Sequence, residues 1–312
     1  MSARACPRRR QLLDDPAEAR TSARKAENLT QSALPITVLV QTKNEAAGIE
    51  KCLRALGGAF DEVIVVDSES TDGTQAIATG LGVRVENFSW NGAYPKKKQW
   101  QLDNLVTRNQ FILFLDADET PTKELIDELR HLVVTGRLGS CGAYDIELDY
   151  RFSGRFLRHG HRVTKRCLVD RTVASFPEID DLRSGGMGEL EGHYQPISRG
   201  RIGTLSGRIR HDDVDPVATW FDRHNRYSEW EAYLRVDPAL RRKVRGHRSR
   251  QGQLFDAMPG KPILFFCYSF FFRLGFLDGR AGLDYAIALA SYYWQIDLKV
   301  RELTRIDRRT HP

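Results

Sequence analysis

Short apolar runs alternate with helix-like segments over the first half of this chain. Such runs occupy residues 36–40, 63–66 and 111–115, and an amphipathic stretch over residues 49–56, closed by two glycines, separates the first two. Strands without a polar face are buried on both sides, as in a parallel sheet that helices cover on each face. The alternation therefore predicts an α/β fold built on a mostly parallel sheet.

The remainder of the chain divides at two changes of composition. Residues 1–33 have few large apolar side chains and predict a flexible tail, and from Pro216 the pattern becomes helical. We therefore expect a main domain over residues 34–214 and a helical, basic and apolar region over residues 215–312. Further elements are expected at residues 83–85 (strand), 123–134 (helix), 144–152 (half-exposed strand) and 153–210 (loops and short strands).

Composition narrows the class of protein. The chain is 41% apolar and 28% charged, as in a folded soluble protein, and its net charge of +6 favours anionic partners. Its five cysteines are scattered, with no C-x-x-C pair, which argues against a disulfide framework or a zinc site. No secretory signal is recognisable, and no stretch reaches the roughly 18 apolar residues of a spanning helix. A cytoplasmic protein is expected.

Three polar clusters follow the apolar runs, at residues 41–45, 67–74 and 116–119. Ligands of parallel sheets bind at the carboxyl ends of the strands, so these clusters predict the functional edge. In Asp116-Ala117-Asp118 the two carboxylates share one face of extended chain and could hold Mg²⁺ or Mn²⁺. The alternative is a loop in which Thr120-Pro121 caps the next helix.

Two further clusters allow two readings each. Asp67 could accept hydrogen bonds from ribose hydroxyls or a base, or its loop could form an Asx turn at residues 72–74 that caps a helix. The three lysines at residues 96–98 are either a solvated loop or neutralise a diphosphate.

Together these blocks resemble the family 2 glycosyltransferases. The resemblance rests on I-T-V-L-V with T-K-N-E at residues 36–45, V-V-D-S with S-T-D-G-T at residues 65–74, and L-F-L-D-A-D-E at residues 113–119. Further motifs are similar to the branch that includes the lipopolysaccharide-core β-1,4-glucosyltransferases: K-Q at 98–99, R-H-G at 158–160, N-R-Y-S at 225–228 and G-F-L-D-G-R-A-G at 275–282. The likeness covers roughly residues 35–300.

The resemblance implies a GT-A fold and an inverting transfer of a sugar from a nucleoside-diphosphate donor, with UDP-glucose as the expectation from the named branch. It implies roles for particular residues: nucleoside contacts from Thr42, Asn44, Glu45 and Asp67, a diphosphate contact from Lys98, a place near ribose and metal for Asp116, and metal ligation by Asp118. His211 stands where relatives keep a histidine; it is either a third metal ligand or a histidine satisfied by hydrogen bonds.

The acceptor hydroxyl needs a carboxylate to take its proton. Relatives often carry a V-H-E-like segment where this chain has M-G-E-L-E-G-H at residues 187–193, so the pattern is incomplete here. Glu189 is the favoured base, Glu191 the next, and Asp180 or Asp181 follow.

The C-terminal region contains an apolar run over residues 263–272 and a basic run over residues 241–250. The apolar run is too short to span a bilayer. It is either a buried core helix or, as we favour, a segment on an anionic membrane beside the basic run. Family acceptors are often lipid-linked glycans of cell-envelope polysaccharide, which would place the enzyme at the inner face of the cell membrane.

The sequence disfavours three other functions. Nucleic-acid binding would suit the net charge, but no module with stacking aromatic residues is recognisable. A dinucleotide-dependent oxidoreductase would need G-x-G-x-x-G after the first strand, and this motif is missing, as is a Walker motif. An inactive relative that only binds nucleotide-sugars is disfavoured by the retained Asp116 and Asp118.

Overall fold

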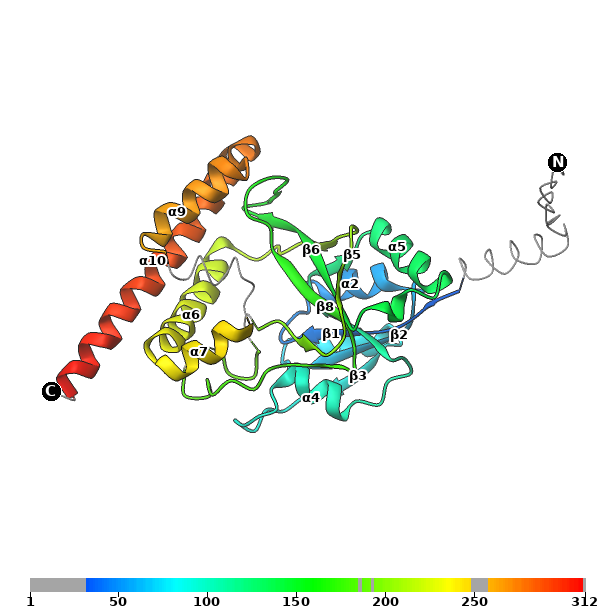
Figure 1. Cartoon of the computed structure of the whole chain (residues 1–312). Coiled ribbons are helices and arrows are strands. Elements are labelled where there is room, and N and C mark those ends of the chain that lie inside the picture. The colour runs from blue at the N-terminus through cyan, green and yellow to red at the C-terminus, as the bar shows by residue number, and fades with distance from the viewer. Residues whose placement is uncertain (1–31, 185–186, 192–193, 248–257, 311–312) are drawn as a thin grey trace, which may run out of the picture.

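The computed structural model describes residues 32–184, 187–191, 194–247 and 258–310. The predicted N-terminal tail lies almost wholly outside these residues. A large sheet with flanking helices occupies the centre of the molecule, and a group of C-terminal helices packs at one side (Figure 1).

Half of the sheet is parallel, in the order β3-β2-β1-β4. Thr42 pairs with Asp67, and Gln41 pairs with Asp116, so the carboxyl ends of β1, β2 and β4 are level with one another. This confirms the predicted α/β fold and brings the polar clusters to one edge. The strands are β1 (Leu34–Thr42), β2 (Phe60–Asp67), β3 (Arg84–Asn87) and β4 (Phe111–Asp116).

The other half is mixed and continues from β4 in the order β8-β6-β12-β5. The antiparallel β8 lies between β4 and β6 and was not predicted, because its first three residues are polar and it lies in a stretch without periodicity. These strands are β5 (Glu119–Pro121), β6 (Ala143–Phe152), β8 (Thr164–Asp170) and β12 (Ile209–His211); β7 (Arg155–Phe156) and β11 (Ile202–Thr204) pair with β6, and β9 (Ala174–Ser175) with β10 (Ile197–Ser198).

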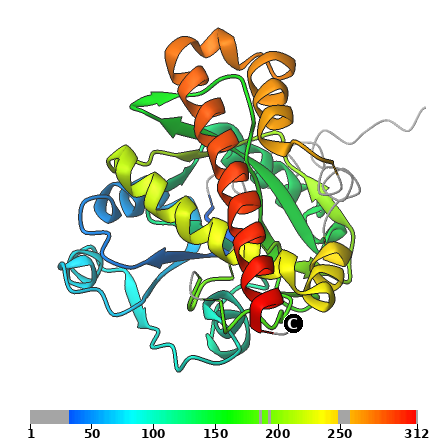
Figure 2. The same ribbon diagram turned by 90° about the vertical axis from the view of Figure 1, so that its left-hand side faces the viewer.

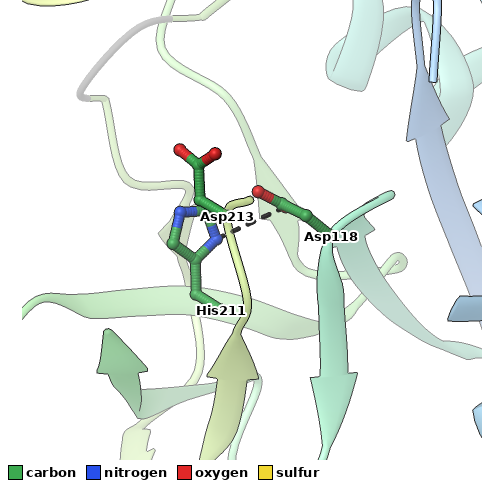
Figure 3. A group of neighbouring side chains, drawn as sticks. All are labelled: Asp118, His211 and Asp213. Carbon is green, nitrogen blue, oxygen red and sulfur yellow. Dashed lines mark ion pairs between the residues drawn. The ribbon is translucent and has the colours of Figure 1, made fainter. Parts of the chain in front are cut away.

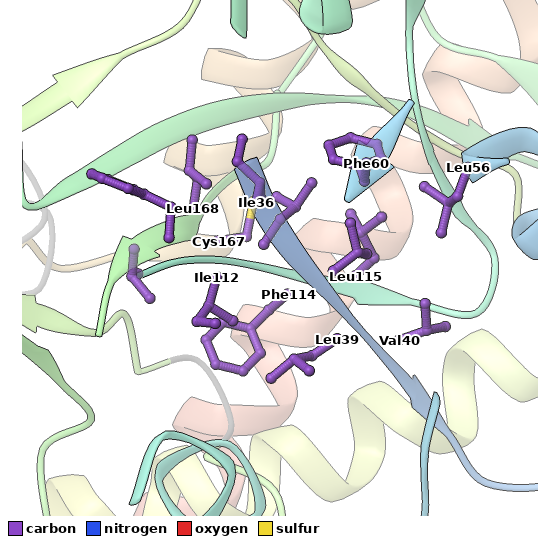
Figure 4. Close-up of a cluster of buried hydrophobic side chains, with 14 of the residues drawn as sticks. Ile36, Leu39, Val40, Leu56, Phe60, Ile112, Phe114, Leu115, Cys167 and Leu168 are labelled. Carbon is purple, nitrogen blue, oxygen red and sulfur yellow. The ribbon is translucent and has the colours of Figure 1, made fainter. Parts of the chain in front are cut away.

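Helices cover the parallel half, with α2 and α5 on one side and α4 on the other (Figure 1). They are α2 (Ile49–Leu56), α3 (Thr74–Gly80), α4 (Lys97–Asn104) and α5 (Lys123–Val134), and a short 3₁₀ turn, η1 (Leu138–Ser140), follows α5. Between them the apolar strands form the core, in which Ile36, Leu39 and Leu115 have no exposed surface (Figure 4). Each such side chain contributes roughly 1.5–3 kcal/mol by burial.

The helix cap considered for Thr120-Pro121 is wrong. Both residues lie in β5, where they pair with β12, and the side chain of Thr122 caps α5 by accepting a hydrogen bond from the Leu125 N–H at 3.3 Å.

The C-terminal helices pack around a second, aromatic core that includes Phe152, Trp220 and Tyr285. They are α6 (Val217–Val236), α7 (Pro238–His247), α9 (Lys261–Cys267), a π-helical turn η2 (Tyr268–Phe272), a 3₁₀ turn η3 (Gly275–Asp278) and α10 (Gly279–Thr310). Among the described residues, no single helix has the length and apolar character needed to cross a membrane; the pair Lys261–Phe272 and Gly275–Ile306, bent by 70°, has them only when taken together.

Candidate functional site

The loops that follow β1 and β2 are joined by hydrogen bonds. The backbone N–H of Asn44 donates to Ser70 Oγ at 2.7 Å, that of Glu45 donates to Thr74 Oγ1 at 2.8 Å, and the N–H of Thr71 donates to Asn44 Oδ1 at 2.9 Å. Asn44 has a positive φ of 59°, which asparagine tolerates better than most residues. The two loops therefore form one surface.

Asp67 organises this surface from below. It is buried, and its carboxylate accepts hydrogen bonds from Thr42 Oγ1 (2.7 Å), Ser70 N–H and Oγ (2.8 and 2.6 Å) and Gln75 Nε2 (2.7 Å). Burial alone would raise the pKa of Asp67, but these hydrogen bonds bring the pKa below its ordinary value. Asp67 is thus an ionised anchor of the loop, and the expected nucleoside contacts of Thr42 and Asp67 stay predictions.

The three lysines have three different environments. Lys96 is buried and its Nζ lies 2.9 Å from Asp181, so it is structural. Lys97, which was not among the predicted site residues, is also buried, and its Nζ donates to the Thr42 carbonyl at 3.1 Å. Burial lowers the pKa of Lys97 to about 8, against the opposing charges of Glu189 and Asp67. Lys98 is half-buried.

Asp116 faces a lysine of the protein. Lys165 of β8 lies 2.8 Å from Asp116 and 2.7 Å from Glu119, whose side chain is only 1% exposed. Burial would raise the pKa of Asp116, but the charge of Lys165 holds this pKa well below its ordinary range, while burial raises the pKa of Glu119. Asp116 and Asp118 therefore have different partners in this structure.

Asp118 lies instead beside His211 and Asp213, where one ligand atom from each residue lies within 4.8 Å of the other two (Figure 3). Asp118 comes from the turn between β4 and β5, His211 ends β12, and Asp213 follows it. The Nδ1 atom of His211 is buried and lies 3.3 Å from Asp118 and 3.6 Å from Glu119, yet it makes no aligned hydrogen bond within the described part of the chain. An orphaned imidazole nitrogen among carboxylates fits a divalent cation such as Mn²⁺.

Neighbouring groups fix this cluster. The ring of Tyr150 stacks on His211 with centroids 4.9 Å apart, and Asp213 pairs with Arg223 and accepts from the Asp215 N–H at 2.9 Å. Burial lowers the pKa of His211, but the charge of Asp118 outweighs burial and raises it overall. Asp213 was not predicted, although its place two residues after His211 repeats the spacing of Asp116 and Asp118.

Glu45 belongs to the same acidic group. Its pKa is raised to about 7, first by burial and then by the charges of Asp118, Asp215 and Asp116. The loop after β1 thus reaches the cation cluster as well as the loop after β2, and a bound cation would restore the ordinary acidity of Glu45.

The candidate bases are differently engaged. The Glu191 carboxylate accepts from the backbone N–H groups of Lys98 and, at 3.0 Å, Gln99, so it caps α4. Asp181 is buried and accepts from Lys96, Tyr94 and Trp230, and Asp180 is exposed and lies 3.8 Å from Arg183. Glu189 is half-exposed, and its carboxylate has no hydrogen bond or ion pair within residues 32–184, 187–191, 194–247 and 258–310. Of the four, Glu189 alone has no partner for its carboxylate among the described residues, whereas Asp180 makes one long, exposed ion pair.

Known proteins are similar to this chain over most of its length. A family model described as glycosyl transferase family 2 matches residues 37–200. LpsC of Rhizobium meliloti, a lipopolysaccharide core biosynthesis glycosyltransferase, is 32% identical over 84% of this chain and 93% of its own length. An uncharacterised glycosyltransferase of Rickettsia bellii is 41% identical over 36% of this chain, a match that spans only 37% of that relative.

A solved structure is also similar in part. Glucosyl-3-phosphoglycerate synthase from Mycobacterium tuberculosis, in complex with Mg²⁺ and UDP, aligns with a TM-score of 0.38 and 19% identity over 66% of this chain and 80% of that one. The family match and the LpsC similarity carry the assignment. The chain belongs to glycosyltransferase family 2, and its fold is GT-A with a helical C-terminal extension.

Proposed function

We propose that this chain is an inverting glycosyltransferase that moves a sugar from a nucleoside-diphosphate donor, a UDP-sugar, to a glycan or lipid-linked acceptor in the synthesis of cell-envelope polysaccharide or lipopolysaccharide. The similarity to LpsC supports the class of pathway. The observation that carries the proposal is the cluster of Asp118, His211 and Asp213 next to the joined loops of β1 and β2.

The cation cluster and the lysines suit a nucleoside diphosphate. Asp118 and His211 would hold Mn²⁺ or Mg²⁺, with Asp213 as a third ligand shared with Arg223. Such a cation, when bound, offsets the negative charge on the departing diphosphate. Lys97 and Lys98 add positive charge at the start of α4, and Lys97 is held in place by the Thr42 carbonyl.

Asp116 has a supporting part in this proposal. Lys165 holds its carboxylate ionised and fixed at the end of β4. There Asp116 would face the ribose side of the donor and lie near the cation. The surface of Asn44 and Glu45 would receive the nucleoside, since both residues are held there by backbone hydrogen bonds to the β2 loop.

Glu189 is proposed as the base that accepts the proton of the acceptor hydroxyl. Its carboxylate is available, whereas those of Glu191 and Asp181 already accept several hydrogen bonds. The backbone carbonyl of Glu189 accepts from the Lys97 N–H at 3.0 Å, which ties the base to the start of α4, where Lys98 would face the diphosphate. Acceptor and donor would therefore meet over the start of α4.

The test is release of nucleoside diphosphate by the full chain from a panel of UDP-, GDP- and dTDP-sugars, with and without Mn²⁺. We expect that one UDP-sugar is turned over and that this release requires the cation. Release should be lost in Asp118→Asn and kept in Asp127→Asn, a matched change at an exposed carboxylate of α5. Release that needs no cation and persists in Asp118→Asn would contradict the proposal. So would a panel in which no donor is turned over and none shifts the melting temperature of the protein.

A further inference from the structure

Large apolar side chains are exposed where the C-terminal helical pair bends. We define residues 263–277, from α9 through η2 to η3, as the apolar tip. Phe265 and Ser269 face inward, but one flank of the tip faces outward. Its exposed side chains are Ile263 (73%), Phe271 (54%), Phe272 (81%), Leu274 (45%), Phe276 (44%) and Leu277 (55%). The core-helix alternative therefore holds for one face of this segment only, because the other face has no cover within the described residues. Membrane contact stays a prediction.

The rim of the apolar tip is positively charged. Arg273 is exposed within it, and Arg280 is exposed at the start of α10. Asp278 is the sole carboxylate between residues 258 and 280, and it accepts from the backbone N–H groups of Arg158 and His159 at 2.9 and 2.7 Å. Its charge is thus directed toward the main domain. Asp284 partly offsets the charge of Arg280, at 3.0 Å, so Arg273 is the cation of the tip that would complement an anionic surface.

The main domain holds the apolar tip in a fixed position. The N–H of Gly160 donates to the Arg273 carbonyl at 2.8 Å, and the N–H of His161 donates to Ser269 Oγ at 3.1 Å. Helix α10 approaches so closely that a Cβ on Gly282 would lie 2.0 Å from the Gly275 carbonyl oxygen. A tip that is locked in this way keeps its apolar side chains exposed rather than folding them inward.

We infer that the apolar tip seats the protein on a bilayer that contains anionic lipid, with the phenylalanines at the boundary between headgroups and acyl chains. Residues 261–272 extend about 18 Å at 1.5 Å per residue, less than the roughly 30 Å of a bilayer core, which suits insertion into one leaflet. Helix α7, with the start of the basic run, lies at the opposite end of α6 from the tip (Figures 1 and 2). Residues 248–250 of the basic run lie outside the described residues. The cations next to the tip are therefore Arg273, Lys261 at the start of α9, and Arg280, whose Nε lies 3.0 Å from Asp284.

This inference deepens the proposed function, because a lipid-linked acceptor would be presented at the same surface. The loop of residues 158–161 that locks the tip follows β7, which pairs with β6, and Tyr150 of β6 stacks on His211. The apolar tip and the cation cluster are thus joined through the hairpin of β6 and β7.

The test is co-sedimentation of the full chain with phosphatidylcholine vesicles, with and without 30 mol% phosphatidylglycerol. We expect binding that increases with phosphatidylglycerol and weakens at least tenfold in the double variant Phe271→Ser/Phe272→Ser. Val106→Ser, a change at a side chain that is 80% exposed on the loop after α4, should bind as the wild type does. Arg273→Glu should weaken binding to the anionic vesicles more than to the neutral ones.

Equal binding by the double variant and the wild type would overturn the inference. A second result would also overturn it: the wild type is a dimer in sedimentation velocity, the double variant is a monomer, and the two bind vesicles equally. The tip would then join two copies of the chain. Release of nucleoside diphosphate, measured on the same samples without vesicles, should be equal in all variants. If the wild type releases no nucleoside diphosphate, the proposed function is contradicted, whereas the result on vesicle binding is unaffected.

Discussion

Lys165→Met should cost the protein a large part of its stability. The ammonium group, with a side chain 19% exposed, lies within 2.8 Å of both Asp116 and Glu119, and its removal leaves two carboxylates facing each other. Removal of one partner from a buried ion pair costs about 3–5 kcal/mol. Because the Asp116 side chain is 45% exposed, we count only the pair with Glu119 and expect about 3 kcal/mol.

Urea unfolding at pH 7 measures this loss. The pKa of Lys165 is raised above its ordinary value of 10.5, so the ammonium group is charged in both states at pH 7 and its contribution is lost only as the pH rises above that value. With an m-value of about 3 kcal/mol/M, the midpoint should fall by about 1 M. Lys123→Met, at an exposed pair of α5, is the control, and Lys165→Met/Glu119→Gln should regain part of the loss. If Lys165→Met and Lys123→Met have the same urea midpoint, the buried ion pair does not stabilise the protein as argued.

Three other changes test other parts of the account. Glu189→Gln should abolish transfer to the acceptor in a radiolabelled-sugar assay while the donor still binds. Glu191→Ala should retain transfer but lower the free energy of unfolding by about 1 kcal/mol, because the cap of α4 is lost. The opposite pattern would make Glu191 the base. Gly282→Ala should lower the melting temperature markedly more than Gly139→Ala, at which a Cβ meets nothing, and equal temperatures would show that the bend is not tightly packed. Since the pKa of Glu45 is raised to about 7, the native state holds a proton that the unfolded state loses, so stability should fall between pH 4.5 and 7; Glu45→Gln should flatten this part of the stability–pH profile, and an unchanged profile would contradict the raised pKa.

The parallel half of the sheet and the edge that carries the site could be predicted from the sequence. Each apolar run is one buried strand, and a change from apolar to polar residues marks its end, so local pattern alone brings Thr42, Asp67 and Asp116 to one edge. The helix at residues 123–134 was also predicted from local pattern, because the helical spacing of its apolar residues is visible within one element.

Partners from distant strands could not be predicted. Lys165 reaches Asp116 only because β8 inserts next to β4, and nothing near either residue in the sequence indicates that order. The three adjacent lysines look alike as letters, yet Lys96 pairs with Asp181, 85 residues later, while Lys97 lies under the end of β1. The choice among the acidic residues for base or cap depends on such contacts and not on local composition.

Mn²⁺ binding in the presence of UDP, followed by isothermal titration calorimetry, tests the central claim most directly. The account predicts saturable binding of one Mn²⁺ per chain that is lost in Asp118→Asn and in His211→Ala, weakened in Asp213→Asn, and retained in Asp127→Asn. Undiminished Mn²⁺ binding by Asp118→Asn and His211→Ala, in samples that melt at the wild-type temperature, would contradict it.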